Sequence, residues 1–167
     1  FMGGAGLNTD NNFGPYCMEQ KIMDCWIRGE GELSVPAYLR GDMNYPGLNG
    51  IPPKQIDKID DLEFPDYSDY ELASYTNKKG LVALPITGSR GCVRACTFCD
   101  IASMWPKYKY RSGHSIAKEI KTQVKRYGAK AFRFTDSLIN GSMKAFRDMT
   151  QELSKFRMAM PKNDRFI

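Results

Sequence analysis

The sequence lacks the features that would place it in a membrane or in a secretory pathway. None of its apolar runs reaches the roughly 18 residues that a membrane-spanning helix needs, and no segment combines the basic start and apolar middle of a signal peptide. It also lacks an even number of cysteines, since five are present and three of them fall within eight residues. This excludes a regular disulfide framework and favours metal binding in a reducing compartment, so we expect a cytoplasmic protein.

The composition is that of an ordinary globular protein. The 167 residues are 42% hydrophobic, 12% aromatic and 26% charged, which excludes disordered, collagen-like and coiled-coil proteins. The length suggests one domain, but the segments resemble parts of two. The chain opens on Phe1 rather than on an initiating methionine, and Arg165–Ile167 is predicted to be an unfinished strand. We therefore expect a fragment truncated at both ends.

Positive charge is concentrated in one part of the chain. The net charge is +5, from 24 Lys and Arg against 19 Asp and Glu, and the excess lies between Arg90 and Arg133. Such a stripe suits nucleic acid or an anionic cofactor. A basic helix face is more commonly only solvated, and we do not expect nucleic acid as a partner. The basic stripe comprises Lys107, Lys109, Arg111, Lys118, Lys121, Lys125 and Arg126.

Local composition divides the chain into three regions, which we expect at 1–41, 42–79 and 80–167. The first contains a predicted strand at Ile22–Arg28 and a predicted helix at Leu33–Leu39, capped by Ser34 and ended by Gly41. The second is rich in proline, acidic residues and tyrosine, and is predicted to be an extended connector between domains. Four aromatic residues should attach this connector to a domain surface: Phe64, Tyr67, Tyr70 and Tyr75.

The third region alternates strands with helices. Leu81–Thr87 and Ala131–Thr135 are predicted strands. A helix capped by Ser115 and ended by Gly128 should follow the first strand, and a helix capped by Ser142 should follow the second. Such a repeat implies parallel strands joined by right-handed crossovers.

The loop after the first of these strands carries Cys92, Cys96 and Cys99. Three thiolates are one ligand short of a closed zinc site or an all-cysteine iron–sulfur cluster. One alternative is therefore a zinc-stabilised nucleic-acid-binding module, its site completed by His114, Cys17 or Cys25. Another is an iron–sulfur electron-transfer protein, although the usual fourth cysteine is missing. The third is a four-iron cluster with one iron open to a small-molecule ligand.

The spacing of the three cysteines, with Phe98 directly before the last, resembles the signature of radical S-adenosylmethionine enzymes. Leu84–Thr87, Gly88, Gly91 and the phrase Tyr110–Ser112 are similar to that family as well. The resemblance implies that Cys92, Cys96 and Cys99 bind three irons of a [4Fe-4S] cluster, while S-adenosylmethionine chelates the fourth. One electron, expected from a reductase such as flavodoxin or ferredoxin, then cleaves S-adenosylmethionine to methionine and a 5′-deoxyadenosyl radical.

The same resemblance implies roles for three further residues. Phe98 would lie near the adenine of S-adenosylmethionine. Asp136 and Ser137, at the carboxyl end of the second strand, would accept hydrogen bonds from its amino group. The alternative for Phe98 is packing within the loop. The alternative for Asp136 and Ser137 is a turn that leads, with Asn140 and Gly141, into the next helix.

The amino-terminal region resembles the end of the cobalamin-binding domain that precedes many radical S-adenosylmethionine domains. The resemblance rests on Gly3, Gly4, residues 26–32 and Leu62–Tyr67, and it implies that the complete protein binds cobalamin, with glycines allowing close backbone approach. The expected fold is α/β: the start of a partial (β/α)6 TIM-like radical S-adenosylmethionine barrel, preceded by the C-terminal end of a Rossmann-like cobalamin-binding domain. The substrate is unknown, and methylation, ring rearrangement and methylthiolation all remain open.

Overall fold

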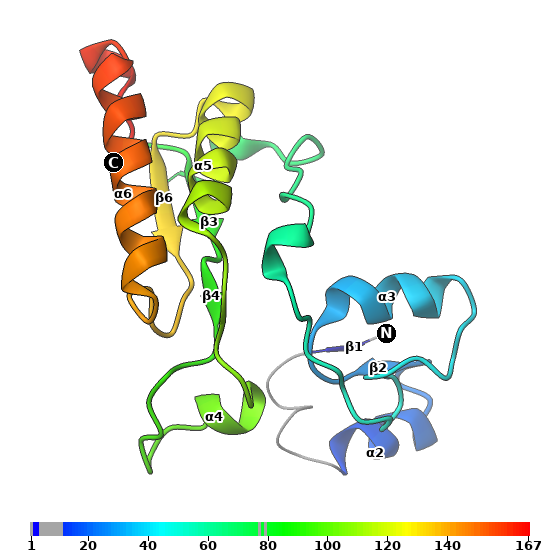
Figure 1. Ribbon diagram of the computed structural model, residues 1–167. Helices are drawn as coiled ribbons and strands as arrows, with labels where there is room; N and C mark the ends of the chain where they lie inside the picture. The colour runs from blue at the N-terminus through cyan, green and yellow to red at the C-terminus, as the bar shows by residue number, and fades with distance from the viewer. Residues whose placement is uncertain (1, 4–11, 77, 79) are drawn as a thin grey trace. The chain divides into compact units, whose positions relative to one another are not determined.

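The computed structural model describes residues 2–3, 12–76, 78 and 80–167 (Figure 1). The chain forms two compact units, one of Phe1–Asp57 with Arg94–Lys107 and one of Lys58–Val93 with Tyr108–Ile167. Both units combine helices with short strands, so the fold is mixed α/β as expected. Among the described residues, no helix has the length and apolar character needed to span a membrane.

The second unit is built on a parallel pair of strands, β3 (Ala83–Ile86) and β6 (Ala131–Phe134), in the register Ala83↔Ala131 to Ile86↔Phe134. Between them in sequence lies helix α5 (Gly113–Tyr127), and helix α6 (Met143–Ala159) follows β6. Figure 1 shows α5 and α6 side by side next to these strands. The predicted parallel pairing is confirmed, although both strands are shorter than expected.

The core of this unit lies between the sheet and the two helices. It contains Ile86 from β3, Ile116 and Ile120 from α5, and Met149 from α6, with Phe166 from the last residues of the chain. Burial of these side chains supplies most of the driving force for folding of the unit.

Ile167 extends the sheet on the free edge of β6. Its N–H donates to the Lys130 carbonyl at 2.8 Å, and its carbonyl accepts from the Phe132 N–H at 3.3 Å. This alternation is the hydrogen-bond pattern of a parallel neighbour. The predicted strand at Arg165–Ile167 is not formed, although these two bonds hold Ile167 beside β6 in a parallel arrangement.

The helix ends are set by side-chain and glycine caps. Ser142 caps α6 as predicted, and Gly128 ends α5 with a φ of 62°. The prediction that Ser115 caps α5 is wrong: the cap is Ser112, whose hydroxyl accepts from the Ser115 N–H at 3.1 Å. Ser115 lies inside the first turn, where its hydroxyl binds the buried side chain of Arg111.

The first unit pairs β1 (Met2–Gly3) with β2 (Trp26–Ile27) in parallel and contains helices α2 (Phe13–Glu19), α3 (Gly31–Leu39) and α4 (Ile101–Met104). Its core includes Cys25, Ile27 and Leu48. Sequence reasoning did not find α2, which ends next to a turn at Lys21 with a φ of 55°.

Two predictions in the first unit need correction. The strand predicted at Ile22–Arg28 is reduced to β2, and the Ile22 side chain is 62% exposed. Helix α3 begins at Gly31 rather than at Leu33, and Ser34 lies within it. The Ser34 hydroxyl donates back to the Glu30 carbonyl at 2.9 Å, which is the bond that a serine inside a helix makes to the carbonyl four residues earlier. Gly41, with a φ of 85°, follows this helix as predicted.

The second half of the predicted connector lies along α5 and includes short 3₁₀ helices at Ile59–Asp61 and Leu72–Ser74. The Arg111 guanidinium carbon lies over the Phe64 ring, 5.4 Å from the ring centroid. The rings of Tyr67 and Tyr127 contact each other with their centroids 5.8 Å apart. The Gln123 amide donates to the Pro65 carbonyl at 2.9 Å. The expectation that aromatic residues attach the connector to a domain surface is therefore confirmed for Phe64 and Tyr67.

Candidate functional site

The cysteine loop begins and ends on a two-stranded antiparallel ribbon. β4 (Ser89–Arg90) pairs with β5 (Lys109–Tyr110) through Ser89↔Tyr110 and Arg90↔Lys109. Gly91 follows β4 with a φ of 82°, in the left-handed region that favours glycine. We call residues 87–90 and 109–111 the neck of the cysteine loop, which itself spans residues 91–108.

The part of the loop that carries the cysteines is largely exposed to solvent. The Cys99 N–H donates to the Cys96 carbonyl at 3.1 Å, which closes a turn with one cysteine at each end. Both of these cysteines are exposed, Cys92 is partly buried, and the Phe98 side chain is 92% exposed. None of the five cysteines forms a disulfide, so none is prevented in that way from ligating a metal as its thiolate.

The structure does not assemble these residues into a finished metal centre. Within the described part of the chain, no three His, Cys, Asp or Glu side chains converge as a metal site. Cys92 belongs to the second unit, whereas Cys96 and Cys99 belong to the first. The donor set nonetheless fits an iron–sulfur cluster in its chemistry, because thiolates are the ligands such clusters prefer and the loop holds three of them.

The residues considered as completing ligands for zinc lie elsewhere. Cys17 and Cys25 are buried, and burial raises the pKa of the Cys25 thiol above its ordinary value. His114 is on α5, with Nδ1 2.9 Å from Glu152 Oε1. The Lys121 ammonium donates to the other Glu152 oxygen at 2.7 Å, and these two contacts, Lys121 first, lower the pKa of Glu152.

Asp136 lies against the start of the cysteine loop. It follows β6 at the edge of the sheet where β3 also ends, and its carboxylate accepts from the Gly88 N–H at 2.9 Å and the Ser89 hydroxyl at 2.5 Å. Thr87 and Thr135, the residues after the two strands, join their hydroxyls at 2.9 Å. Ser137 is exposed. The structure thus places the predicted acidic residue at the carboxyl end of the strands, beside the neck.

Sequence reasoning missed the buried ion pair between Arg111 and Glu119. Their side chains are 7% and 2% exposed, and the Arg111 guanidinium also donates to the Thr87 carbonyl at 3.1 Å and the Ser115 hydroxyl at 2.9 Å. A usable signal was present in the sequence. Ser115, Glu119 and Gln123 repeat every four residues, which places them on one helix face beside the apolar one.

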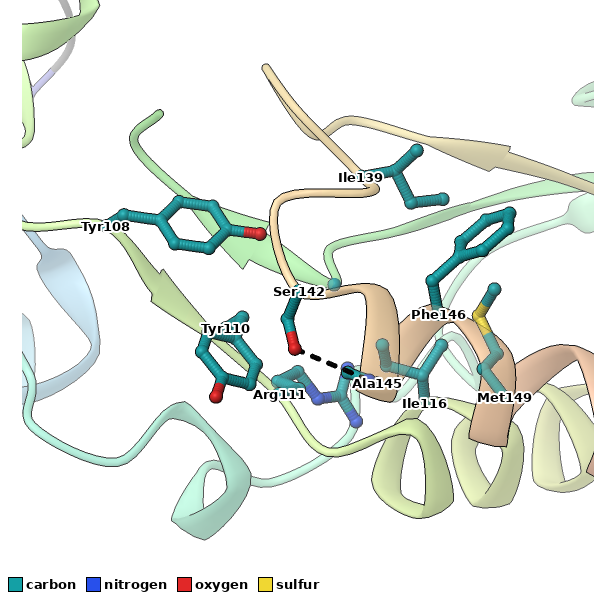
Figure 2. A pocket seen from close by; sticks show the side chains of 10 residues that line it. Tyr108, Tyr110, Arg111, Ile116, Ile139, Ser142, Ala145, Phe146 and Met149 are labelled. Carbon is teal, nitrogen blue, oxygen red and sulfur yellow. Dashed lines mark hydrogen bonds between the residues drawn. The ribbon is translucent and has the colours of Figure 1, made fainter. Parts of the chain in front are cut away.

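A small pocket lies between the neck and the two helices (Figure 2). Tyr108 and Tyr110, stacked at 5.7 Å, stand on one side and Phe146 and Met149 on the other. Its volume is about 10 Å³, close to the space of one water molecule. Partial burial raises the pKa of Tyr108. The pocket is a packing defect beside the neck and is too small for a cofactor or substrate.

The basic stripe is divided among different contacts. Arg111 is buried, Lys121 pairs with Glu152, and Arg126 pairs with Asp66 at 2.8 Å. Lys118 lies 6.0 Å from the Phe64 ring centroid. Much of the charge of the basic stripe is therefore paired with acidic or aromatic groups of the protein itself.

The two glycines assigned to cobalamin differ in what the structure describes. Gly3 is the second residue of β1 and pairs with Ile27 of β2. Gly4 lies outside the described residues. Their proposed approach to the nucleotide tail of cobalamin stays a prediction.

Several curated proteins are similar in sequence to this chain, among them a cyclase and a methyltransferase. Anaerobic magnesium-protoporphyrin IX monomethyl ester cyclase from Synechocystis sp. is 27% identical over 146 residues, which cover 79% of this chain and 29% of the cyclase. Cytidylyl-2-hydroxyethylphosphonate methyltransferase from Streptomyces wedmorensis is 27% identical over 127 residues, or 71% of this chain and 24% of that enzyme. The chain thus spans less than a third of these relatives, and no family model matches it.

Solved structures show where this fold occurs. The radical S-adenosylmethionine methyltransferase TsrM from Kitasatospora setae, with tryptophan and a S-adenosylmethionine analogue bound, matches 97% of this chain with a TM-score of 0.63 and 20% identity, over 34% of its own length. Its structure with cobalamin and a [4Fe-4S] cluster matches with a TM-score of 0.60 and 19% identity. The likeness shows a shared mixed α/β fold. The resemblance of the cysteine motif to radical S-adenosylmethionine enzymes thus has a counterpart in the fold, which this chain shares with a methyltransferase of that kind.

Proposed function

We propose that this chain is part of a radical S-adenosylmethionine enzyme whose cluster ligands are Cys92, Cys96 and Cys99. The observation that carries the proposal is the placement of these cysteines on one loop, directly after the first strand of a parallel β/α unit, in a fold shared with such an enzyme. Active sites of parallel β/α folds are built at this carboxyl edge of the sheet.

The three thiolates would hold three irons of a [4Fe-4S] cluster and leave the fourth to S-adenosylmethionine. The bound cluster supplies one electron for the reductive cleavage of S-adenosylmethionine, which gives methionine and a 5′-deoxyadenosyl radical. The chain's own task is to bind and orient the two groups. The exposed ring of Phe98, next to Cys99, is available to cover the adenine.

Asp136 is the residue we assign to the amino group of S-adenosylmethionine, with Ser137 beside it. A carboxylate accepts about four hydrogen bonds through its two oxygens, and the structure accounts for one at each oxygen. Asp136 is partly exposed, so acceptor capacity remains on the solvent side. An ammonium at this position would form a charge-assisted hydrogen bond.

The remaining assignments concern the complete protein. We propose that residues 80–167 begin the partial (β/α)6 barrel, that 1–41 end a Rossmann-like cobalamin-binding domain with Gly3 and Gly4 near the cofactor, and that 42–79 connect them. The chain's similarity to the solved cobalamin-containing methyltransferase supports this arrangement. We expect a cytoplasmic enzyme reduced by flavodoxin or ferredoxin, because thiolate ligands require a reducing compartment.

The first test is electron paramagnetic resonance of the anaerobically reconstituted, dithionite-reduced full-length protein, with and without S-adenosylmethionine. We expect the signal of a reduced four-iron cluster that shifts when S-adenosylmethionine is added, because the open iron gains a ligand. A four-iron signal that does not change when S-adenosylmethionine is added would instead identify an electron-transfer protein. Bound zinc without acid-labile sulfide would identify the zinc-stabilised module.

Substitution of a ligand sharpens this test. Cys96→Ala should abolish cluster assembly, because two thiolates cannot hold the cluster. Cys17→Ala is the matched control, since Cys17 is a buried thiol outside the loop, and it should retain the full iron and sulfide content. An intact four-iron cluster in Cys96→Ala would contradict the ligand assignment.

A further inference from the structure

The ion pair between Arg111 and Glu119 differs from the other ion pairs of this unit in its burial. Its side chains are 7% and 2% exposed, whereas those of Arg126 and Asp66 are both 52% exposed. Burying two charges is unfavourable unless their hydrogen bonds are nearly complete. The five N–H groups of an arginine must therefore all find acceptors.

The structure supplies these acceptors to Arg111. One terminal nitrogen donates to Glu119 and to the Thr87 carbonyl. The other donates to the hydroxyl and the carbonyl of Ser115 at 2.9 and 3.3 Å, and Nε donates to the same hydroxyl at 3.3 Å. Only the Thr87 carbonyl among these acceptors lies outside α5. The pair therefore connects α5 to the end of β3.

Arg111 holds two successive carbonyls where the chain leaves β3. Its side chain binds the Thr87 carbonyl at 3.1 Å, and its backbone N–H donates to the Gly88 carbonyl at 2.8 Å. The Gly88 N–H in turn donates to Asp136. The same short segment of the neck is thus bound by Arg111, which precedes α5, on one side and by Asp136, which follows β6, on the other.

Gly88 has little room between these two contacts. A Cβ at this position would lie 3.1 Å from Asp136 Oδ1 and 3.1 Å from the Ile116 side chain. Both distances are tighter than ordinary van der Waals contacts of a Cβ atom. The absence of a side chain at Gly88 thus lets the neck lie close to both Asp136 and α5.

We propose that Arg111 is a positioning residue for the cluster. With Glu119 as its counter-ion, it sets the direction in which the chain leaves β3 and hence the place of Cys92 relative to Asp136. The proposal rests on the proposed function. A role in stability alone would not require this pair, because apolar residues of similar size often replace a buried ion pair without loss. Holding the Thr87 carbonyl and Glu119 together requires the planar fork of a guanidinium.

The test compares three variants of the full-length protein. Arg111→Met with Glu119→Leu removes both charges and keeps the apolar volume. Arg111→Lys keeps the positive charge but loses the planar guanidinium with its five donors. This variant carries the test if the double variant does not fold. Arg126→Met is the matched control, because it removes an α5 guanidinium that pairs with Asp66 rather than with the neck.

The first measurement is amide hydrogen exchange of the protein without cluster. Loss of a hydrogen bond to a charged group should speed exchange at Gly88–Arg90 and Lys109–Arg111 by about 10-fold in the double variant and in Arg111→Lys. The control should exchange at the wild-type rate in both segments. If the double variant and Arg111→Lys, which we call the neck variants, both exchange their amide hydrogens at the wild-type rate, the proposal is overturned, whatever the protein binds.

The second measurement concerns the reconstituted cluster. In both neck variants we expect iron loss to a chelator about 10-fold faster than in wild type, as for other residues that orient metal ligands, and an altered paramagnetic resonance spectrum. A wild-type spectrum and chelation rate in folded neck variants would overturn the positioning role and leave the proposed function intact. A wild-type protein that assembles no cluster would instead overturn the proposed function.

Discussion

Two kinds of thiol occur in this chain, and their surroundings separate their chemistry. Cys25 is fully buried in the core of the first unit, where burial raises its pKa and keeps it as an inert thiol. Cys96 and Cys99 are exposed at the two ends of a turn. A buried thiol cannot reach a cluster, so burial excludes Cys17 and Cys25, the two cysteines that lie outside the spacing motif.

Two substitutions test the role of Asp136 in binding S-adenosylmethionine. Asp136→Ala removes both its contacts with the neck and its charge, whereas Asp136→Asn removes the charge but keeps one acceptor oxygen. We expect both variants to retain the cluster and to bind S-adenosylmethionine about 10-fold more weakly, because a hydrogen bond to a charged group is lost. Equilibrium binding of S-adenosylmethionine to the reconstituted protein measures this.

Asp148→Asn provides the control for these variants. Asp148 is an acidic residue of α6 that pairs with Lys144 four residues earlier, so its loss should leave the affinity for S-adenosylmethionine unchanged. Wild-type affinity in Asp136→Ala would remove Asp136 from the site.

Helix α5 illustrates which elements could be predicted from the sequence. Its apolar spacing, with Ile116 and Ile120 facing the core, was recognisable because it depends only on the helical period. The burial of Glu119 could not be predicted in this way, because a charged residue is buried only when a partner from another segment, here Arg111, satisfies it.

Local ambiguity accounts for the errors in helix ends. Ser112 and Ser115 are both reasonable caps by residue type, and only the turn after β5 shows that Ser112 precedes the helix. The cysteine motif and the position of Asp136 after β6 could be recognised from the sequence. The contacts of Asp136 with Gly88 and Ser89 could not, because they join residues 47 and 48 positions apart.

The contact between the connector and α5 should depend on pH. Asp66 accepts hydrogen bonds from the Tyr127 hydroxyl at 2.6 Å, the Ser68 N–H at 2.8 Å and Arg126 at 2.8 Å. These contacts, that of Tyr127 first, hold the pKa of Asp66 well below its usual range. Because the folded-state pKa is lowered, the stabilisation is present above the unfolded pKa of about 3.9 and is lost as the pH falls further.

Denaturation of wild-type protein and Asp66→Asn at several pH values tests this dependence. The wild type should be the more stable at pH 7, and the difference should shrink steadily below about pH 4. Asp69→Asn, which removes a neighbouring exposed carboxylate, is the control and should not reproduce the pattern. A difference between wild type and Asp66→Asn that is independent of pH would contradict the assignment.

For the whole molecule, the position of the cores determines what metal removal should do. The core of the second unit and that of the first are formed without Cys92, Cys96 or Cys99. An iron–sulfur cluster on the loop would therefore not be needed to bury the apolar residues. In a zinc-stabilised module, by contrast, folding depends on the metal.

Chelation distinguishes these cases. We expect the protein to keep its helical circular dichroism and its thermal unfolding midpoint within a few degrees after iron is removed, because each unit retains its core. The Cys96→Ala variant should unfold at the same temperature as the metal-free wild type. Loss of helical signal on chelation would instead support the zinc-stabilised module.

The neck also has a consequence for how the chain reaches its fold. β3 and β6 are separated in sequence by the cysteine loop and α5, and closing a longer segment costs more entropy. Once residues 87–90 pair with 109–111, the loop between them no longer contributes to the length that must be closed. The rate at which β3 and β6 find their register then depends on α5 and its flanking turns. The length of the cysteine loop then affects the closing of the neck rather than the pairing of β3 with β6.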